Sequence, residues 1–328
     1  MKLICGPMAT ISHPAFRKLV ERFGGCDEYF TEMINAGTLL TGGPFESYYL
    51  NPSPVPQKLV WQLTGRNAEH MKEAAKLLVK LPGLGLDLNM GCSAPDIYRY
   101  GAGISWMTKP VEETSKMVQD VFEVVKAHNQ QTGEHKRCSV KLRLGDEDFT
   151  DEGFFNFCDM LCDCGVELLT LHPRTKKEKL TRPVRYHYCE SLAQRMHKKG
   201  VKVCLNGNVK DEASYKKALE QAPSVDAVMI SRACVQKPWI FAKISNPSFS
   251  VKIDMQELAL NYIDDVEIFQ PPEFWKTRLQ RFFSYFCLNF KFSHYAQTQF
   301  LNAKDNEHLR ERIKEFFSKC PEEQFVEL

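Results

Sequence analysis

The sequence predicts an α/β protein, a TIM (β/α)8 barrel followed by a small all-α helical domain. Between residues 3 and 244, short apolar runs alternate with amphipathic stretches, and the pair recurs eight times. After Asn246-Pro247 the β pattern stops. Strict alternation implies parallel strands with helical crossovers, and eight repeats favour closure into a barrel. A doubly wound open sheet is the alternative, but the Gly-rich fingerprint expected at its first turn is missing.

The expected strands are short apolar runs, at residues 3–5, 29–31, 59–62, 86–89, 139–142, 168–171, 203–205 and 227–230. The expected helices show apolar residues at helical spacing, over 14–23, 68–80, 111–128, 152–164, 188–198, 211–221 and 238–244. The second connection, residues 35–56, is irregular and rich in Gly, Pro and Tyr.

Two domains follow from the length and from this pattern. The 328 residues exceed a barrel of roughly 250 residues and leave an appendage. Residues 255–320 read as several helices rich in Phe, Leu and Tyr. We therefore expect a catalytic barrel over residues 1–247 and a helical domain over 248–328.

The composition indicates a globular protein, because 43% of residues are hydrophobic and 26% are charged. No apolar run is long enough to cross a membrane, and the N-terminus turns polar too early for a signal peptide. We expect a cytoplasmic protein whose 12 cysteines are reduced. Cys158, Cys162 and Cys164 form a C-x3-C-x-C cluster, which is more typical of buried helix residues than of a metal site, so we expect no metal.

The net charge of +2 is too small to identify a nucleic-acid partner, but two segments are locally basic. Residues 174–185 hold six cations against Glu178 alone: Arg174, Lys176, Lys177, Lys179, Arg182 and Arg185. Residues 274–304 hold five cations and no acid, interleaved with aromatic residues: Lys276, Arg278, Arg281, Lys291 and Lys304. Taken alone, each segment is more typical of a solvated charged face that overlies a stripe of core residues. RNA binding is the alternative.

Polar residues follow the expected strands, where the carboxyl ends of barrel strands build an active site. In chain order they are Pro7-Met8, Thr31-Glu32, Gln62, Asn89 with Cys92, Lys141 with Arg143, His172 with Arg174, Asn206 with Asn208, and Ser231 with Arg232. Each has an ordinary structural explanation, such as a turn at Asn206-Gly207-Asn208. Their joint occurrence predicts a bound polar ligand.

These side chains fit a flavin. A cationic Lys141 beside the pyrimidine edge would stabilise an anionic reduced ring, and Gln62 could bond to the same edge. The last two strand ends, with Asn206, Asn208, Ser231 and Arg232, lie where barrels commonly hold phosphate. We expect the flavin phosphate there.

At this point the chain resembles the tRNA-dihydrouridine synthase family over nearly its whole length. The motifs that carry the resemblance are Gly6-Pro7-Met8, Thr31-Glu32-Met33, Gln62-Leu63-Thr64-Gly65, Asp87-Leu88-Asn89-Met90-Gly91-Cys92, Gly101-Ala102-Gly103, Lys141-Leu142-Arg143, His172-Pro173-Arg174-Thr175, Asn206-Gly207-Asn208, and Arg232 with Pro238-Trp239-Ile240-Phe241. The family has a flavin-binding barrel followed by a small helical RNA-binding domain, which matches the architecture expected above.

The resemblance implies FMN as cofactor, NADPH or NADH as reductant, and reduction of the uracil C5=C6 bond in tRNA. It places Pro7, Met8, Gln62, Lys141, His172, Asn206, Asn208 and Arg232, with the neighbouring Ser231, around FMN. It places Asn89, Arg143 and Arg174 near the uridine or its backbone, and it makes Cys92 the general acid. We expect no obligate protein partner and therefore a monomer.

The role of Cys92 also has a physical basis. Hydride addition at C6 leaves enolate character at C5, which needs a proton, and a thiol with a pKa of about 8.5 is mostly protonated at neutral pH. The family usually has Pro directly after this cysteine, whereas here Ser93-Ala94 precede Pro95, so we expect a slightly different turn. Further departures are Ile104-Ser105-Trp106 and the Ser231 that stands in place of Gly.

A uridine stacked in folded RNA must turn out into the barrel mouth while the rest of the RNA is held elsewhere. This requirement favours RNA contacts for both basic segments. Two alternatives stay open. One is a flavin barrel that reduces a free pyrimidine or a small enone, and the other is a non-catalytic RNA-binding relative.

Overall fold

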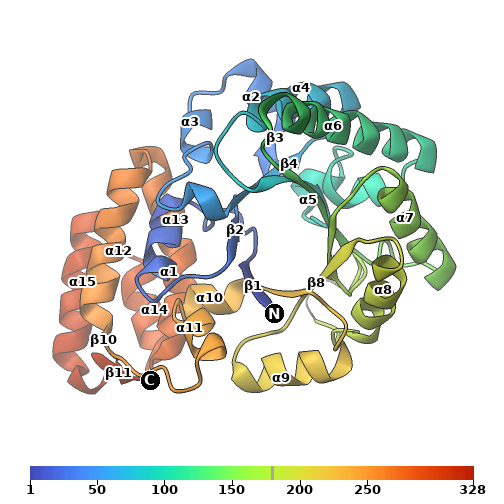
Figure 1. The fold of residues 1–328 in the computed structure, drawn as a ribbon. Helices are drawn as coiled ribbons and strands as arrows, with labels where there is room; N and C mark the ends of the chain where they lie inside the picture. Colours follow the sequence, from blue (N-terminus) through green and yellow to red (C-terminus); the bar gives the residue numbers. More distant parts are fainter. Residues whose placement is uncertain (179–180) are drawn as a thin grey trace.

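The computed structural model describes residues 1–178 and 181–328, and it forms the closed barrel that the sequence predicts (Figure 1). Its eight parallel strands are β1 (Lys2–Cys5), β2 (Glu28–Phe30), β4 (Leu59–Thr64), β5 (Gly85–Met90), β6 (Arg137–Arg143), β7 (Leu168–His172), β8 (Lys202–Asn206) and β9 (Ala227–Ile230). β1 pairs with both β2 and β9, and β2 pairs with β4, which closes the ring. A doubly wound sheet keeps two open edges, so that alternative is wrong.

Helices surround the barrel, one after almost every strand (Figure 1). They are α1 (Pro14–Glu21), α4 (Ala68–Leu78), α6 (Val111–Thr132), α7 (Asp151–Asp163), α8 (His187–His197), α9 (Glu212–Gln221), α10 (Arg232–Gln236) and α11 (Ile240–Ser245). Local signals set their ends. Thr150 accepts the Gly153 amide at the start of α7, and Asp211 with Ser214 forms a capping box on α9.

The irregular second connection contains short elements that the sequence pattern does not reveal. They are β3 (Ile34–Asn35), α2 (Ala36–Thr41) and α3 (Glu46–Tyr49). β3 adds to the end of β4, and Asn35 caps α2 by accepting the amides of Gly37 and Thr38. Another short helix, α5 (Pro95–Tyr98), follows the loop that carries Cys92.

The C-terminal part is helical, as predicted, with α12 (Met255–Phe269), α13 (Pro272–Phe286), α14 (Ser293–Leu301) and α15 (Asn306–Lys319). It also contains an antiparallel ribbon of β10 (Lys252–Asp254) and β11 (Phe325–Glu327), which the sequence analysis missed. Three-residue strands are too short to show an alternating pattern.

The aromatic residues of segment 274–304 form the core of this helical region. Buried rings pack edge-on or stacked against one another, at Phe282, Phe283, Phe286, Phe290 and Phe300. The core-stripe interpretation of these rings is therefore confirmed. The cations between them differ in exposure. Arg278 is buried, whereas four others are exposed: Lys276, Arg281, Lys291 and Lys304.

Ion pairs join the helical region to the barrel, and Figure 1 shows α12 beside α1. Arg278 on α13 pairs with Glu32, which follows β2, and both side chains are buried. Asp265 on α12 accepts from Lys18 at 2.6 Å and from Arg22 at 2.9 Å. These contacts fix the helical region next to the loops that leave β1 and β2.

Across the described parts of the chain, no helix is both long and apolar enough to cross a membrane. The same residues contain no group of three or more His, Cys, Asp or Glu side chains that could hold a metal ion. All cysteines are free, and Cys158 and Cys162 lie on α7 with Cys164 as its C-cap. Cys158 is buried, and the Cys162 Sγ lies 3.0 Å from the Met196 Sδ.

Candidate active site at the carboxyl ends of the strands

Two adjoining cavities open at the carboxyl ends of the strands. The larger cavity, of about 590 Å³, is lined by Pro7, Met8, Lys141, Arg143, His172, Asn206, Gly207, Asn208, Val209, Lys210, Met229, Ser231, Arg232, Ala233, Gln236, Tyr285 and Leu288. The smaller cavity, of about 190 Å³, is lined by Pro7, Ala9, Met33, Gln62, Asn89, Gly91, Cys92, Lys141, Arg143 and His172. They share Pro7, Lys141, Arg143 and His172, so the two cavities form one site.

The structure brings together on these walls every strand-end residue singled out from the sequence except Thr31, Glu32 and Arg174. Thr31 Oγ1 accepts the backbone N–H of Gln62, and Glu32 pairs with Arg278. The Arg174 side chain is only 1% exposed and lies behind His172. The sequence analysis missed four polar or large lining residues, Lys210, Gln236, Tyr285 and Leu288. Tyr285 and Leu288 belong to the helical region, and no sequence pattern shows that they reach the barrel mouth.

The cavity walls are cationic. Lys141, Arg143, Lys210 and Arg232 line them, and no described Asp or Glu does. Burial and the neighbouring Arg174 lower the pKa of Arg143 to about 10. Burial and the surrounding cations, Arg143 first among them, hold the pKa of His172 well below its usual value, so this imidazole is neutral. Such a site attracts an anionic ligand.

The charge of Lys141 depends on pH near neutrality. Burial, followed by the charge of Arg143, lowers its pKa to about 8, and the opposing attraction of the buried Asp87 is weaker. Its ammonium group therefore titrates close to physiological pH. A bound anion would restore its charge.

Cys92 is half-buried on a loop that is held at both of its polar backbone atoms. Its N–H donates to Asn89 Oδ1 at 2.9 Å, and its carbonyl accepts from the Ile104 amide at 3.0 Å. Gly103, at φ +60°, lies so close that a Cβ there would stand 2.6 Å from the Cys92 carbonyl oxygen. Pro95, which directly follows the Ser93-Ala94 departure, takes the first turn of α5.

The loops after β1, β8 and β9 approach one another closely at the other end of the site. A Cβ on Gly6 would stand 2.4 Å from Ser231 Oγ. Gly207 has a φ of 136° and Asn208 a φ of 54°, which turns this loop sharply. Asn206 donates to the Met229 carbonyl at 2.9 Å, so its side chain is fixed.

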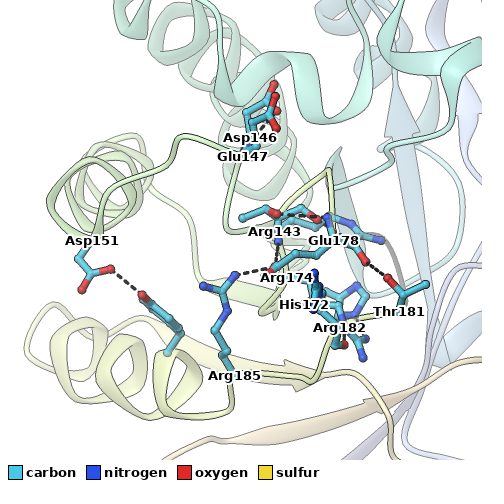
Figure 2. Close-up of polar contacts among 12 residues, drawn as sticks. Arg143, Asp146, Glu147, Asp151, His172, Arg174, Glu178, Thr181, Arg182 and Arg185 are labelled. Carbon is cyan, nitrogen blue, oxygen red and sulfur yellow. Dashed lines mark hydrogen bonds and ion pairs between the residues drawn. The ribbon is translucent and has the colours of Figure 1, made fainter.

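The loop after β7 is tied down by its own basic residues (Figure 2). Arg174 donates through Nε to the Arg182 carbonyl at 2.6 Å, and its Nη1 lies 2.9 Å from His172 Nε2. Arg143 Nε donates to the Gly91 carbonyl at 3.0 Å, which links β6 to the Cys92 loop.

Three acids neutralise much of segment 174–185, and two of them come from elsewhere in the chain. Lys176 pairs with Asp146 and Lys177 with Glu147, both from the loop after β6, and Arg185 pairs with Glu178 at 2.6 Å. Lys179 lies outside the described residues. The cluster looks free in the sequence because its compensating acids are about thirty positions away in the chain.

A closed parallel barrel with a cationic cavity at the carboxyl ends of its strands defines a TIM-barrel protein with its ligand site where barrel enzymes have theirs. The family model "Dihydrouridine synthase (Dus)" matches residues 3–326, and the chain therefore belongs to the dihydrouridine synthase family of oxidoreductases. The resemblance seen in the sequence motifs is confirmed.

Curated relatives of the chain carry the name of the same family. A probable tRNA-dihydrouridine synthase of Aquifex aeolicus is 29% identical over 242 residues, covering 73% of this chain and 71% of that protein. Another, of Helicobacter pylori, is 29% identical over 266 residues, covering 80% and 76%. Among solved structures, the old yellow enzyme homologue of Zymomonas mobilis matches with a TM-score of 0.51 and 13% identity, over 76% of this chain and 89% of that one. This last likeness concerns the fold alone.

Proposed function

We propose that this protein is an FMN-dependent tRNA-dihydrouridine synthase, which uses NADPH or NADH to reduce the C5=C6 bond of a uridine in tRNA. One observation carries the proposal: a cysteine thiol and an acid-free cationic cavity share one set of walls at the barrel mouth. Family membership supports it, and so do the names of the curated relatives.

The donor set fits FMN. The larger cavity lies within the usual size range of cofactor sites, about 300–1,000 Å³. Its cations and amides suit a ligand with a phosphate and a ring edge of carbonyl groups. The residues that would hold FMN are Pro7, Met8, Gln62, Lys141, His172, Asn206, Asn208, Ser231 and Arg232, with the phosphate near the last four.

When bound, FMN would supply the hydride that C6 of the uracil receives. Cys92 would donate the proton that C5 then requires. Asn89 and Arg143 line the same cavity as Cys92 and would hold the uracil or its backbone. Arg174 lines neither cavity, because its side chain is buried against His172.

The helical region would hold the RNA while one uridine enters the cavity. Its exposed cations, Lys276, Arg281, Lys291 and Lys304, suit phosphate contacts. We divide the chain into a barrel domain of residues 1–247 and a tRNA-binding domain of residues 248–328, and we expect a monomer acting in the cytoplasm.

The test uses the purified full chain and tRNA from cells that lack the protein. We expect a yellow protein with a flavin spectrum that, given NADPH or NADH, forms dihydrouridine in tRNA, located by mass spectrometry. Free uridine is the control substrate and should stay unreduced. A colourless protein that leaves tRNA unchanged would overturn the proposal, and equal turnover of free uridine would favour a small-molecule reductase.

A further inference from the structure

An unbroken chain of hydrogen bonds connects a buried carboxylate to the backbone of Cys92. We infer that Asp87 is a positioning residue, which orients the side-chain amides of Gln62 and Asn89 and, through them, the loop that carries Cys92. The inference rests on the proposed function for the role of Cys92, but the chain itself is a property of the fold.

Three links make the chain. Gln62 Nε2 donates to Asp87 Oδ2 at 2.7 Å, and Asn89 Nδ2 donates to Gln62 Oε1 at 2.8 Å. Asn89 Oδ1 then accepts the backbone N–H of Cys92 at 2.9 Å and that of Gly91 at 3.3 Å. All three side chains are buried, at 7% exposure or less, so water does not compete for these contacts.

The carboxylate sets the direction of the chain at one end, and the backbone N–H groups of Gly91 and Cys92, which only donate, set the same direction at the other. An ionised carboxylate only accepts hydrogen bonds, so Gln62 must turn its nitrogen toward Asp87. The Gln62 oxygen therefore faces Asn89 and accepts a hydrogen bond from the Asn89 nitrogen. The Asn89 oxygen is then left to accept the Cys92 amide. An uncharged partner at position 87 could donate as well as accept, and reversal of both amides would then be opposed only by loss of the bonds from the Gly91 and Cys92 amides to Asn89.

This ordering also sets what the cavity offers a ligand. Both amide oxygens are engaged inside the protein, whereas each amide nitrogen keeps a second hydrogen. Gln62 and Asn89 line the smaller cavity together with Cys92. Asp87 therefore makes this wall a donor surface, suited to the carbonyl edge of a flavin or a uracil.

The surroundings of Asp87 predict how the chain responds to pH. Burial raises the pKa of Asp87 to about 6, against the opposing effect of its bonds from Gln62 and Ser139 and of the β6 cations Lys141 and Arg137. Above this pH the carboxylate accepts from Gln62. Below it, the protonated acid can donate, and the direction of the chain is no longer fixed at the Asp87 end.

The test compares Asp87→Asn, which preserves shape, with Ser139→Ala, which removes the other side-chain bond to Asp87 and leaves the chain intact. We expect Asp87→Asn to lower tRNA turnover by about tenfold or more, since both the position of the acid and the donor wall of the cavity change. The wild-type rate should fall below about pH 6. This decline should persist in Ser139→Ala and vanish in Asp87→Asn.

A second measurement does not depend on activity. Iodoacetamide labelling of the native protein, quantified by peptide mass spectrometry, should modify Cys92 several-fold faster in Asp87→Asn because the loop is released. Cys162 and Cys164, half-buried at the end of α7, serve as internal references whose labelling should not change. Gln62→Met breaks the next link and should raise Cys92 labelling in the same way if Asp87→Asn does not fold.

The inference would be overturned if a folded Asp87→Asn variant matched the wild type in turnover, pH profile and Cys92 labelling. Failure of the proposed function looks different. In that case the wild-type protein itself would leave tRNA unreduced, while the labelling comparison would still decide whether Asp87 positions the Cys92 loop.

Discussion

Nη1 of Arg174 lies 2.9 Å from Nε2 of His172, so one site residue expected at the substrate instead contacts another expected at the cofactor. A guanidinium only donates hydrogen bonds, which makes His172 Nε2 the acceptor and places the imidazole proton on Nδ1. The low pKa of His172 keeps the ring in this neutral form. Arg174 thus fixes the tautomer of His172.

Arg174→Ala should raise the pKa of His172 and release its tautomer, because one neighbouring cation and one donor are lost. Titration of the histidine ring signals by NMR measures both effects. Arg182→Ala is the control, because Arg182 meets Arg174 only through its backbone carbonyl. A His172 pKa that stays the same in Arg174→Ala would disprove this role.

Cys92→Ala should retain flavin and tRNA binding but lower turnover by roughly 10²-fold or more, as loss of a general acid does. Stopped-flow measurement of flavin reoxidation by tRNA would isolate the affected step. Cys162→Ala, at another half-buried thiol, is the matched control and should behave like the wild type. The assignment fails if the Cys92 variant turns over normally.

FMN affinity should decline as pH rises through about 8, because Lys141 loses its proton there in the free protein. An anionic ligand favours the charged form, so binding above this pH must take up a proton and weakens by up to tenfold per pH unit. Titration of flavin-free protein with FMN from pH 6.5 to 9.5 measures the trend. Lys141→Arg keeps its charge over this range and should flatten the curve.

Arg278→Ala should destabilise the protein by about 3–5 kcal/mol, since it leaves Glu32 buried without its cation. Urea unfolding gives the free energy difference. Lys76→Ala breaks the exposed pair with Glu73 and should cost less than about 1 kcal/mol. Equal losses in the two variants would mean that the ion pair between barrel and helical region is not a significant contributor.

The salt dependence of tRNA binding should distinguish the two basic segments. Replacing the exposed Lys276 and Arg281 with Ala should reduce the slope of log affinity against log salt by about one per lost phosphate contact. Replacing Lys176 and Lys177, which pair with Asp146 and Glu147, should change it less. The opposite ranking would assign the main RNA contacts to the loop after β7.

Strand positions and most cavity residues could be predicted from the sequence, because the apolar runs mark the strands and parallel strands bring their carboxyl ends to one face. Lys141, His172 and Asn206 met there for that reason. Tertiary partners could not be predicted. The acids that neutralise Lys176 and Lys177 belong to another loop, and Asp87 looks like an ordinary strand residue until its partner Gln62 is known.

The closure of the barrel through β1 and β9 has a consequence during synthesis of the protein. Ile4 pairs with Met229, so β1 keeps an open edge until the ribosome has released β9. The β10–β11 ribbon forms later still, because it requires residues 325–327. Unpaired strand edges invite association with other chains, and β1 is therefore open to such association until β9 emerges.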